Sequence, residues 1–245
     1  MINILYVKKK VRWDFVEERL NKFISSSGVC SRRKADEYIA NGLVTVNGAV
    51  ITELGTKVSD TDEICVNGEA INKEQEKVYI LINKPVGYVT TSKEQFNRPC
   101  ILDLIKEKKR VYSVGRLDMF SEGMLILTND GEFVNKIIHP KVHVCKTYIV
   151  EVNKTLKDED IKKLATGVDI GGYITKDAEA LKIDDNTLKL SIYEGKNRQI
   201  RKMCEVLGYK VRTLKRISIG KLELGNLKSG SYRYLNIDEI NKIFE

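Results

Sequence analysis

The chain has 245 residues, of which 42% are hydrophobic and 31% charged, and its formal net charge is +8. A chain of this length can bury a sizeable core, which suits one large domain and one small one. The longest apolar stretches are only a few residues. Residues 8–10 and Arg12 are basic and follow a short apolar start, without the apolar core and cleavage site of a secretory signal. These features argue against a membrane or secreted protein, so we predict a cytoplasmic one.

The cysteines and histidines give little sign of a metal site. The five cysteines lie far apart and form no C-x-x-C pair, which indicates neither a disulfide framework nor a zinc ribbon. His139 and His143 have the i,i+4 spacing of one helix face, but Pro140 should break the helix that would align them. Even with Cys145 nearby, we expect no metal to be bound there.

The positive charge is concentrated in two regions. Residues 196–216 carry 8 basic residues against Glu205 alone, and residues 8–33 carry 8 basic residues against three acidic ones. One charge run by itself suits a solvated helix face equally well. Two basic clusters far apart in the sequence favour a nucleic acid as the partner.

Residues 17–74 have the pattern of a small helix-and-strand module. Ser31 is a suitable N-cap for the second of two short helices, and Gly42 is a suitable stop. Asn-Gly pairs at 47–48 and 67–68 predict tight turns between short strands. The polar stretch 69–77 predicts a linker, and residues 1–16 form an extension without an assigned role. The residues predicted to face inward are Leu20, Phe23 and Ile24 on the first helix and Ala35, Tyr38 and Ile39 on the second.

Residues 75–245 alternate predicted strands and helices. One pair of consecutive strands is joined by a tight turn, at 184–186, and no glycine-rich nucleotide-binding fingerprint occurs. We therefore predict an α+β domain on a mainly antiparallel sheet, without a nucleotide cofactor. The predicted strands are 78–83, 88–91, 110–115, 124–129, 146–153, 178–183, 187–193 and 210–220, and the predicted helices are 131–138, 156–167 and 197–208.

The stretch YSVGRLDMFSEGMLILTND, residues 112–130, places Arg116 and Asp118 two positions apart at the end of a predicted strand. Residues two apart in an extended segment face the same way, so this pair can form one ion pair or address one ligand. Spacing alone favours the ordinary salt bridge. The chain has no G-x-S-x-G elbow and only two histidines, which leaves little for a Ser-His or Cys-His nucleophile.

The first module resembles the S4 RNA-binding domain. The resemblance rests on RLNKFISSSGVCSRRKADEYIANGLVTVNG, in which Ser31, Arg32 and Arg33 open the second helix. It implies that Arg32 and Arg33 contact RNA phosphates, which a helix N-terminus also attracts. The alternative is that both are merely solvated residues of the first turn.

The rest of the chain resembles the pseudouridine synthases, and specifically the S4-containing group that modifies ribosomal RNA, the RsuA/RluB/RluE/RluF group. The G-R-L-D signature lies at 115–118. The supporting motifs occur in the expected order: LINKPVGYVTT at 81–91, KTYIVEV at 146–152 and EGKNRQIRKMCEVLGYKVRTLKRISIG at 194–220. With the S4 module, the resemblance spans about residues 17–235.

The resemblance implies roles for individual residues. Asp118 matches the aspartate that the family requires for catalysis, and Arg116 matches the signature arginine near the flipped nucleotide. Tyr148 matches the tyrosine that stacks on the target uracil. Arg201 matches the arginine that pairs with the catalytic carboxylate, and Leu214 matches an apolar wall of the pocket. The family's reaction gains and loses no atom, so we expect neither a redox cofactor nor a metal.

The resemblance also implies a substrate. Arg198 and Lys202, on the basic helix, are expected to hold RNA around the flipped nucleotide. Ser121, the Asn197-Arg198 pair and VNKII at 134–138 are closer to the RluF type, which acts on 23S rRNA. We therefore predict a monomer that modifies 23S rRNA, either free or in an assembling ribosomal subunit. The alternatives are the same activity on 16S rRNA, as in the RsuA type, and a non-catalytic RNA-binding or assembly factor.

Overall fold

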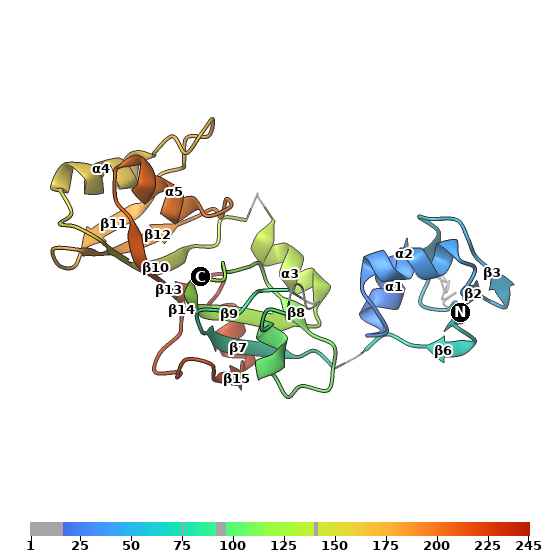
Figure 1. Ribbon diagram of the computed structural model, residues 1–245. Coiled ribbons are helices and arrows are strands. Elements are labelled where there is room, and N and C mark those ends of the chain that lie inside the picture. The colour runs from blue at the N-terminus through green and yellow to red at the C-terminus, as the bar shows by residue number, and fades with distance from the viewer. Residues whose placement is uncertain (1–16, 75, 92–96, 140–141) are drawn as a thin grey trace, which may run out of the picture. The chain divides into compact units, whose positions relative to one another are not determined.

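The computed structural model describes residues 17–74, 76–91, 97–139 and 142–245 (Figure 1). The chain divides into two compact units, residues 1–75 and residues 76–245. Among the described residues, no helix combines the length and apolar character needed to cross a membrane.

The first unit contains the two helices that the sequence predicts, α1 (Leu20–Ser26) and α2 (Arg32–Ala40). The Ser31 hydroxyl accepts a hydrogen bond from the Lys34 amide at 3.3 Å, so Ser31 caps α2 as predicted. Gly42 follows the end of α2 with φ +68°, the left-handed conformation that favours glycine at a helix stop. Tyr38 is partly buried against the unit's core, whose helical members are Leu20, Phe23, Ile24, Ala35 and Ile39.

Short antiparallel strands complete this unit. The four-stranded sheet has the order β3-β2-β5-β6, from β2 (Val44–Val46), β3 (Ala49–Val50), β5 (Ile64–Val66) and β6 (Glu69–Ile71). A separate pair joins β1 (Glu18–Arg19) to β4 (Lys57–Val58). Asn47 and Asn67 have φ of 50° and 52°, and the glycine after each also has positive φ. Both Asn-Gly turn predictions are therefore confirmed.

The second unit is built on a nine-stranded sheet whose main path is β11-β12-β10-β13-β9-β7-β15, with β8 beside β9 and β14 beside β13. Of its pairings in the described residues, only β9 with β13 is parallel. The predicted α+β class with a mainly antiparallel sheet is confirmed. The strands are β7 (Tyr79–Lys84), β8 (Tyr112–Ser113), β9 (Glu122–Thr128), β10 (Lys146–Val152), β11 (Glu179–Lys182), β12 (Thr187–Ile192), β13 (Val211–Ile219), β14 (Leu222–Glu223) and β15 (Tyr232–Tyr234).

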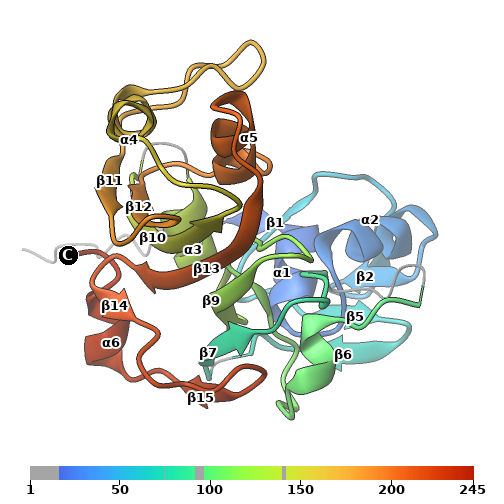
Figure 2. The same cartoon turned by 60° about the vertical axis from the view of Figure 1, so that its left-hand side comes forward.

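Helices cover both faces of this sheet, which explains the almost continuous apolar runs of β7 and β9. Alternate residues of these strands enter two different clusters: Ile80 and Leu125 join the core that includes α4 and α5, whereas Leu81 and Ile126 join the core under α3 and α6. Figure 2 shows α4 and α5 beside β10–β12, with α6 next to β14. The helices are α3 (Gly131–Ile138), α4 (Asp158–Thr166), α5 (Gln199–Val206) and α6 (Ile237–Asn241), with a 3-10 turn at Ile101–Leu104.

Some local predictions for the second unit were wrong. The strand predicted at 88–91 is a loop with one isolated bridge, between Val89 and Cys100, so its β-branched residues lack a continuous partner strand. The strand predicted at 110–115 is shortened to Tyr112–Ser113 because Gly115, with φ +72°, turns the chain. Arg116 and Asp118 therefore follow in a loop and not in an extended strand. The elements β14, β15 and α6 were not predicted.

A close backbone approach at Gly123 joins the loop that carries Asp118 to strand β13. Gly123 is the Cα partner of Arg216 in the parallel β9–β13 pair and has φ +103°. A Cβ at this position would lie 2.3 Å from the carbonyl oxygen of Arg216 and 2.7 Å from its nitrogen. Only glycine fits here, because both contacts are with backbone.

We expect Gly123→Ala to destabilise the protein more than Gly171→Ala. Gly171 has a similar φ, +98°, but a Cβ there meets no atom within 4 Å, so it isolates the backbone strain of about 1–3 kcal/mol. At Gly123 the overlap with Arg216 adds roughly 1–3 kcal/mol. Chemical denaturation of both variants measures this difference. Equal losses of unfolding free energy would show that the close approach is not what requires glycine at 123.

Candidate active site

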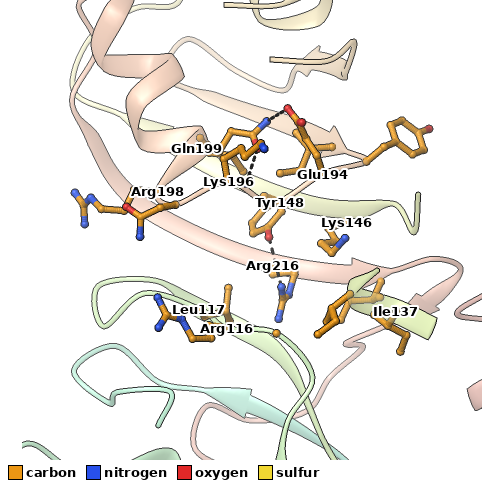
Figure 3. Close-up of a pocket in the computed structure, with 18 of the residues that line it drawn as sticks. Arg116, Leu117, Ile137, Lys146, Tyr148, Glu194, Lys196, Arg198, Gln199 and Arg216 are labelled. Atoms are coloured by element: carbon orange, nitrogen blue, oxygen red, sulfur yellow. Dashed lines mark hydrogen bonds between the residues drawn. The ribbon is translucent and has the colours of Figure 1, made fainter. Parts of the chain in front are cut away.

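A cavity of about 530 Å³ in the second unit collects side chains that are far apart in the sequence (Figure 3). Its lining comes from the loop after β8, from β10, from the segment that leads into α5 and from β13. Arg201 and Lys202, both half-buried on α5, do not line it. The sequence-predicted residues that do line it are Arg116, Asp118, Tyr148, Arg198 and Leu214.

Asp118 is half-buried and opens a tight turn whose backbone is firmly held. The Ser121 amide donates to the Asp118 carbonyl at 3.0 Å, which closes the turn. The Gly87 amide donates to the carbonyl of Met119 at 2.8 Å. The Lys84 ammonium donates to the carbonyl of Ser121 at 2.7 Å. The turn is thus fixed by the end of β7 and by the loop that follows it.

Lys84 is fully buried, with 0% of its surface exposed, which is unusual for a lysine. Besides its bond to Ser121, its ammonium donates to the carbonyl of Pro85 at 3.0 Å. Burial lowers the pKa of Lys84 from 10.5 to about 8, although the negative charges of Asp118 and Glu122 act in the opposite direction. The LINKPVGYVTT motif contains this lysine, but sequence reasoning gave it no role.

Arg201 supports the same turn and does not form the expected ion pair with Asp118. Its Nη2 donates to the Phe120 carbonyl at 2.7 Å and to the Ser121 hydroxyl at 3.4 Å. Its Nη1 donates to the Val211 carbonyl at 3.4 Å. Burial lowers the pKa of Arg201, while the charge of Asp118 raises it, so the two groups interact electrostatically. The Arg201 guanidinium is therefore held by backbone carbonyl groups of Phe120 and Val211, and not by the Asp118 carboxylate.

Tyr148 and Arg216 face each other across β10 and β13 inside the cavity (Figure 3). Tyr148 is 7% exposed and Arg216 is 3% exposed. The Arg216 Nε donates to the Met124 carbonyl at 2.7 Å, and its Nη1 lies 3.5 Å from the Tyr148 hydroxyl. Its Nη2 is buried and, among the described residues, has no hydrogen-bond partner. An unpaired buried donor is costly, so this group is suited to a ligand that supplies an acceptor.

Sequence reasoning did not single out Arg216, although a signal was present. On β13, Leu214 and Arg216 are two residues apart and both are buried. Because alternate residues of a strand face the same side, an inward Leu214 predicts an inward arginine at 216. A charged residue at an inward position of a strand is a functional candidate.

A hydrogen-bond network holds the segment that leads into α5. Gln199 donates to Glu194 at 2.7 Å and accepts from the Lys196 amide at 3.0 Å. The Tyr173 hydroxyl donates to the other oxygen of Glu194 at 2.5 Å. Arg198 then adopts the left-handed conformation, with φ 53°, at the N-cap of α5. The network fixes the backbone on either side of this arginine at the rim of the cavity (Figure 3).

The cavity is strongly cationic, with apolar walls. Among the described residues that line it, only Asp118 and Glu194 carry a carboxylate, and burial lowers the pKa of the lining residue Lys146 to about 8. An aromatic ring, apolar walls and surrounding cations suit a nucleotide: the base stacks and the phosphates meet positive charge. The cationic lining residues are Arg116, Lys146, Lys176, Lys196, Arg198 and Arg216.

His139 and His143 also line this cavity. Within residues 17–74, 76–91, 97–139 and 142–245, no group of three or more His, Cys, Asp or Glu side chains is placed to hold a metal ion.

In the first unit, Arg32 and Arg33 are both exposed on the first turn of α2. Lys34 is engaged with Glu37 at 2.6 Å on the same helix. The helix N-terminus adds partial positive charge to the two guanidinium groups. This end of α2 is therefore suited to an anion such as a phosphate group.

Comparisons with known proteins agree with both parts of this description. The family model "RNA pseudouridylate synthase" matches residues 78–206, and the model "S4 domain" matches residues 18–64. Ribosomal large subunit pseudouridine synthase B of Bacillus subtilis (strain 168) is 42% identical over 233 residues, which are 92% of this chain and 95% of the relative.

Two further relatives extend the comparison. The dual-specificity RNA pseudouridine synthase RluF of Escherichia coli (strain K12) is 41% identical over 93% of this chain and 78% of its own length. A crystal structure of a pseudouridylate synthase superposes with a TM-score of 0.69 at 32% identity, covering 92% of this chain and 99% of that one. This chain belongs to the RNA pseudouridine synthase family and is an isomerase that carries an S4 domain.

The buried lysine beneath the turn should make stability depend on pH. Because the pKa of Lys84 is about 8 in the folded protein and 10.5 ordinarily, the unfolded state binds more protons between these values. The free energy of unfolding therefore rises with pH across this window, by on the order of 3 kcal/mol in total. In Lys84→Met we expect the rise between pH 8 and 10 to be about 2 kcal/mol smaller than in the wild type.

Denaturant unfolding at pH 7, 8, 9 and 10 measures this difference. Lys189→Met, at an exposed position of β12, is the matched control and should keep the wild-type dependence. A Lys84→Met variant with the same pH dependence as the wild type would show that Lys84 keeps its proton throughout.

Proposed function

We propose that this protein converts a specific uridine of 23S rRNA into pseudouridine, with Asp118 as the catalytic residue. The observation that supports this proposal most is that one cationic cavity holds Asp118, Tyr148, Leu214 and Arg216 together. The choice of 23S rRNA is supported by the relative named as a large-subunit enzyme and by the RluF-type features at Ser121 and 197–198.

The reaction explains the residue types of the cavity. The N-glycosidic bond between N1 of uracil and C1′ of ribose breaks, the base turns while it is held, and a bond forms from C5 to C1′. The proton on C5 is lost and N1 gains one, so no atom is gained or lost. The Asp118 carboxylate offsets the positive charge that develops on the sugar, and Tyr148 with Leu214 holds the flat base.

Arg216 contributes the donor that the detached base requires. When the glycosidic bond breaks, uracil takes the bonding electrons, and the negative charge is shared by its carbonyl oxygens. The buried Nη2 of Arg216, which has no partner among the described residues, donates to one of these oxygens. Such a donor is worth more in a buried site than in water, because the site is already organised for the developing charge.

The target nucleotide must leave its helix to reach this cavity, so the remaining RNA has to be held elsewhere. Arg116 and Arg198 at the cavity bind the flanking phosphates, together with Lys202 on α5. The S4 module, residues 17–74, anchors the RNA through Arg32 and Arg33, and residues 75–245 perform the chemistry. The substrate is 23S rRNA, free or in an assembling subunit.

Purified protein incubated with 16S and 23S transcripts tests this proposal. We expect pseudouridine at a defined position of 23S rRNA and none in 16S rRNA, as mapped by chemical probing and sequencing. Asp118→Asn keeps the size of the side chain but removes its charge, so it should abolish tritium release from labelled uridine while RNA affinity stays within a few-fold. Asp177→Asn, at an exposed position outside the cavity, is the matched control.

Each failure has a distinct meaning. Modification of 16S rRNA alone would identify a small-subunit enzyme. Turnover near the wild-type level in Asp118→Asn would disprove the catalytic role of this carboxylate. Tight RNA binding without any modification would indicate a non-catalytic assembly factor.

A second measurement separates anchoring from chemistry. Replacing Arg32 and Arg33 by alanine should weaken RNA binding and flatten its salt dependence by up to about two units of log-log slope, if each makes one phosphate contact. The single-turnover rate at saturating RNA should barely change. A double variant with Lys162→Ala and Lys189→Ala, both exposed in the second unit, controls for the loss of charge. A collapse of the saturated rate with an unchanged slope would contradict the anchoring role.

A further inference from the structure

Phe120 is an exposed aromatic residue in the turn that Asp118 opens. It is 60% exposed and does not line the cavity. Within the described residues its ring forms no aromatic pair, unlike Phe133 and Phe244, which pack edge to face. A single exposed hydrophobic residue is unremarkable by itself. Phe120 is a candidate for a functional role because it lies in the same turn as Asp118.

The backbone of the turn is fixed while the ring of Phe120 is left in water. The carbonyl of Phe120 itself accepts from Arg201 at 2.7 Å. The carbonyls of Met119 and Ser121, on either side, accept from Gly87 and Lys84. These three hydrogen bonds fix the backbone from which the exposed ring of Phe120 projects. The chain thus holds an apolar ring in solvent at a defined place.

The surroundings of this ring suit RNA. Val86, next to the amide that binds Met119, is 52% exposed and adds a second apolar side chain on the neighbouring loop. Arg116 is exposed two residues before Asp118, and Arg201 lies beneath the turn. Apolar groups among cations match a nucleobase and its phosphates better than they match an apolar protein surface.

We propose that Phe120 stacks on the nucleobase adjacent to the extruded uridine and fills the gap that extrusion leaves. This inference rests on the proposed function, since it places the target sugar at Asp118. The first and last Cα atoms of such a turn lie within about 7 Å of each other, so a ring in this turn is near the neighbouring nucleotides. Extrusion costs unstacking energy, and an aromatic ring recovers part of it with any base because every base has a π-face.

Single-turnover kinetics at saturating RNA test this role. Two stem-loops carry the uridine that the wild-type protein modifies in the 23S transcript: in one the uridine is stacked and opposed by a partner base, in the other it is bulged. We expect Phe120→Ala to slow the stacked substrate about 5- to 150-fold, the range that base–aromatic stacking implies. The bulged substrate should lose much less, because its uridine is already unstacked.

Other substitutions at position 120 test whether an aromatic ring is required there. Phe120→Trp should keep most of the wild-type rate on the stacked substrate, and Phe120→Leu should fall between Trp and Ala. Ile237→Ala, which removes a 66% exposed apolar side chain on α6, is the matched control and should behave like the wild type. A second readout needs no turnover: 2-aminopurine beside the target should be quenched by Asp118→Asn protein, and much less so when Phe120→Ala is added.

The outcomes separate this inference from the proposed function. If the wild type modifies neither stem-loop nor any ribosomal transcript, the proposed function fails. If the wild type is active and Phe120→Ala matches it on both stem-loops, only the stacking role is overturned. Equal loss on both stem-loops with a lowered melting temperature would make Phe120 a structural part of the turn and would overturn it too.

Discussion

The close approach of Gly123 to the backbone of Arg216 determines where Asp118 can lie. Strand β9 begins directly after the turn that Asp118 opens, and its first residues pair in parallel with β13. A side chain at 123 would force these strands apart, because its Cβ would overlap the Arg216 carbonyl. The glycine therefore brings two segments, about a hundred positions apart in sequence, to one cavity.

Buried and half-buried cations then bind backbone carbonyl groups of the turn and of strand β9. Lys84 and Arg201 each bind a carbonyl of residues 119–121, and Arg216 binds the carbonyl of Met124. In the described part of the chain, none of these cations forms an ion pair with Asp118. Burying a cation costs less when its donors are satisfied, and carbonyl oxygens satisfy several of these donors, although Arg201 Nε and Arg216 Nη2 are buried without a partner among the described residues. The cations thus supply positive potential near Asp118 while its oxygens remain available to a substrate.

Sequence patterns predicted well those elements that depend on residues only a few positions apart. The cap at Ser31 and the turns at Asn47 and Asn67 depend on residues within a few positions, and the structure confirms them. The long strands and helices of the second unit were also found, because their periodicity extends over several residues. The segment 88–91 failed because a strand needs a partner strand, which composition does not reveal.

The candidate active site was only partly predictable from the sequence. A resemblance supplied Asp118 and Tyr148, and the structure places both at one cavity. The expected Arg201–Asp118 pair was not formed, because a motif names a residue but not which of several nearby acceptors its guanidinium meets. The strand alternation with Leu214 could have indicated an inward Arg216, but the unpaired donor that makes this arginine a candidate is a tertiary property, which the sequence does not reveal.

Uridine is common in RNA, and a cavity of about 530 Å³ can enclose little more than one nucleotide. The cavity can therefore recognise uracil, but it cannot by itself distinguish one uridine from another. Selection among sites must come from surfaces that contact the surrounding RNA, and we propose three of them: the cationic rim, the exposed ring of Phe120 and the arginines of α2. Because these surfaces belong to one chain, binding of the RNA at one surface raises the effective concentration of the RNA at the others. This gain arises only with an RNA whose fold presents groups to several surfaces at once. This makes the shape of the RNA, more than the sequence around the uridine, the property that such an enzyme can read.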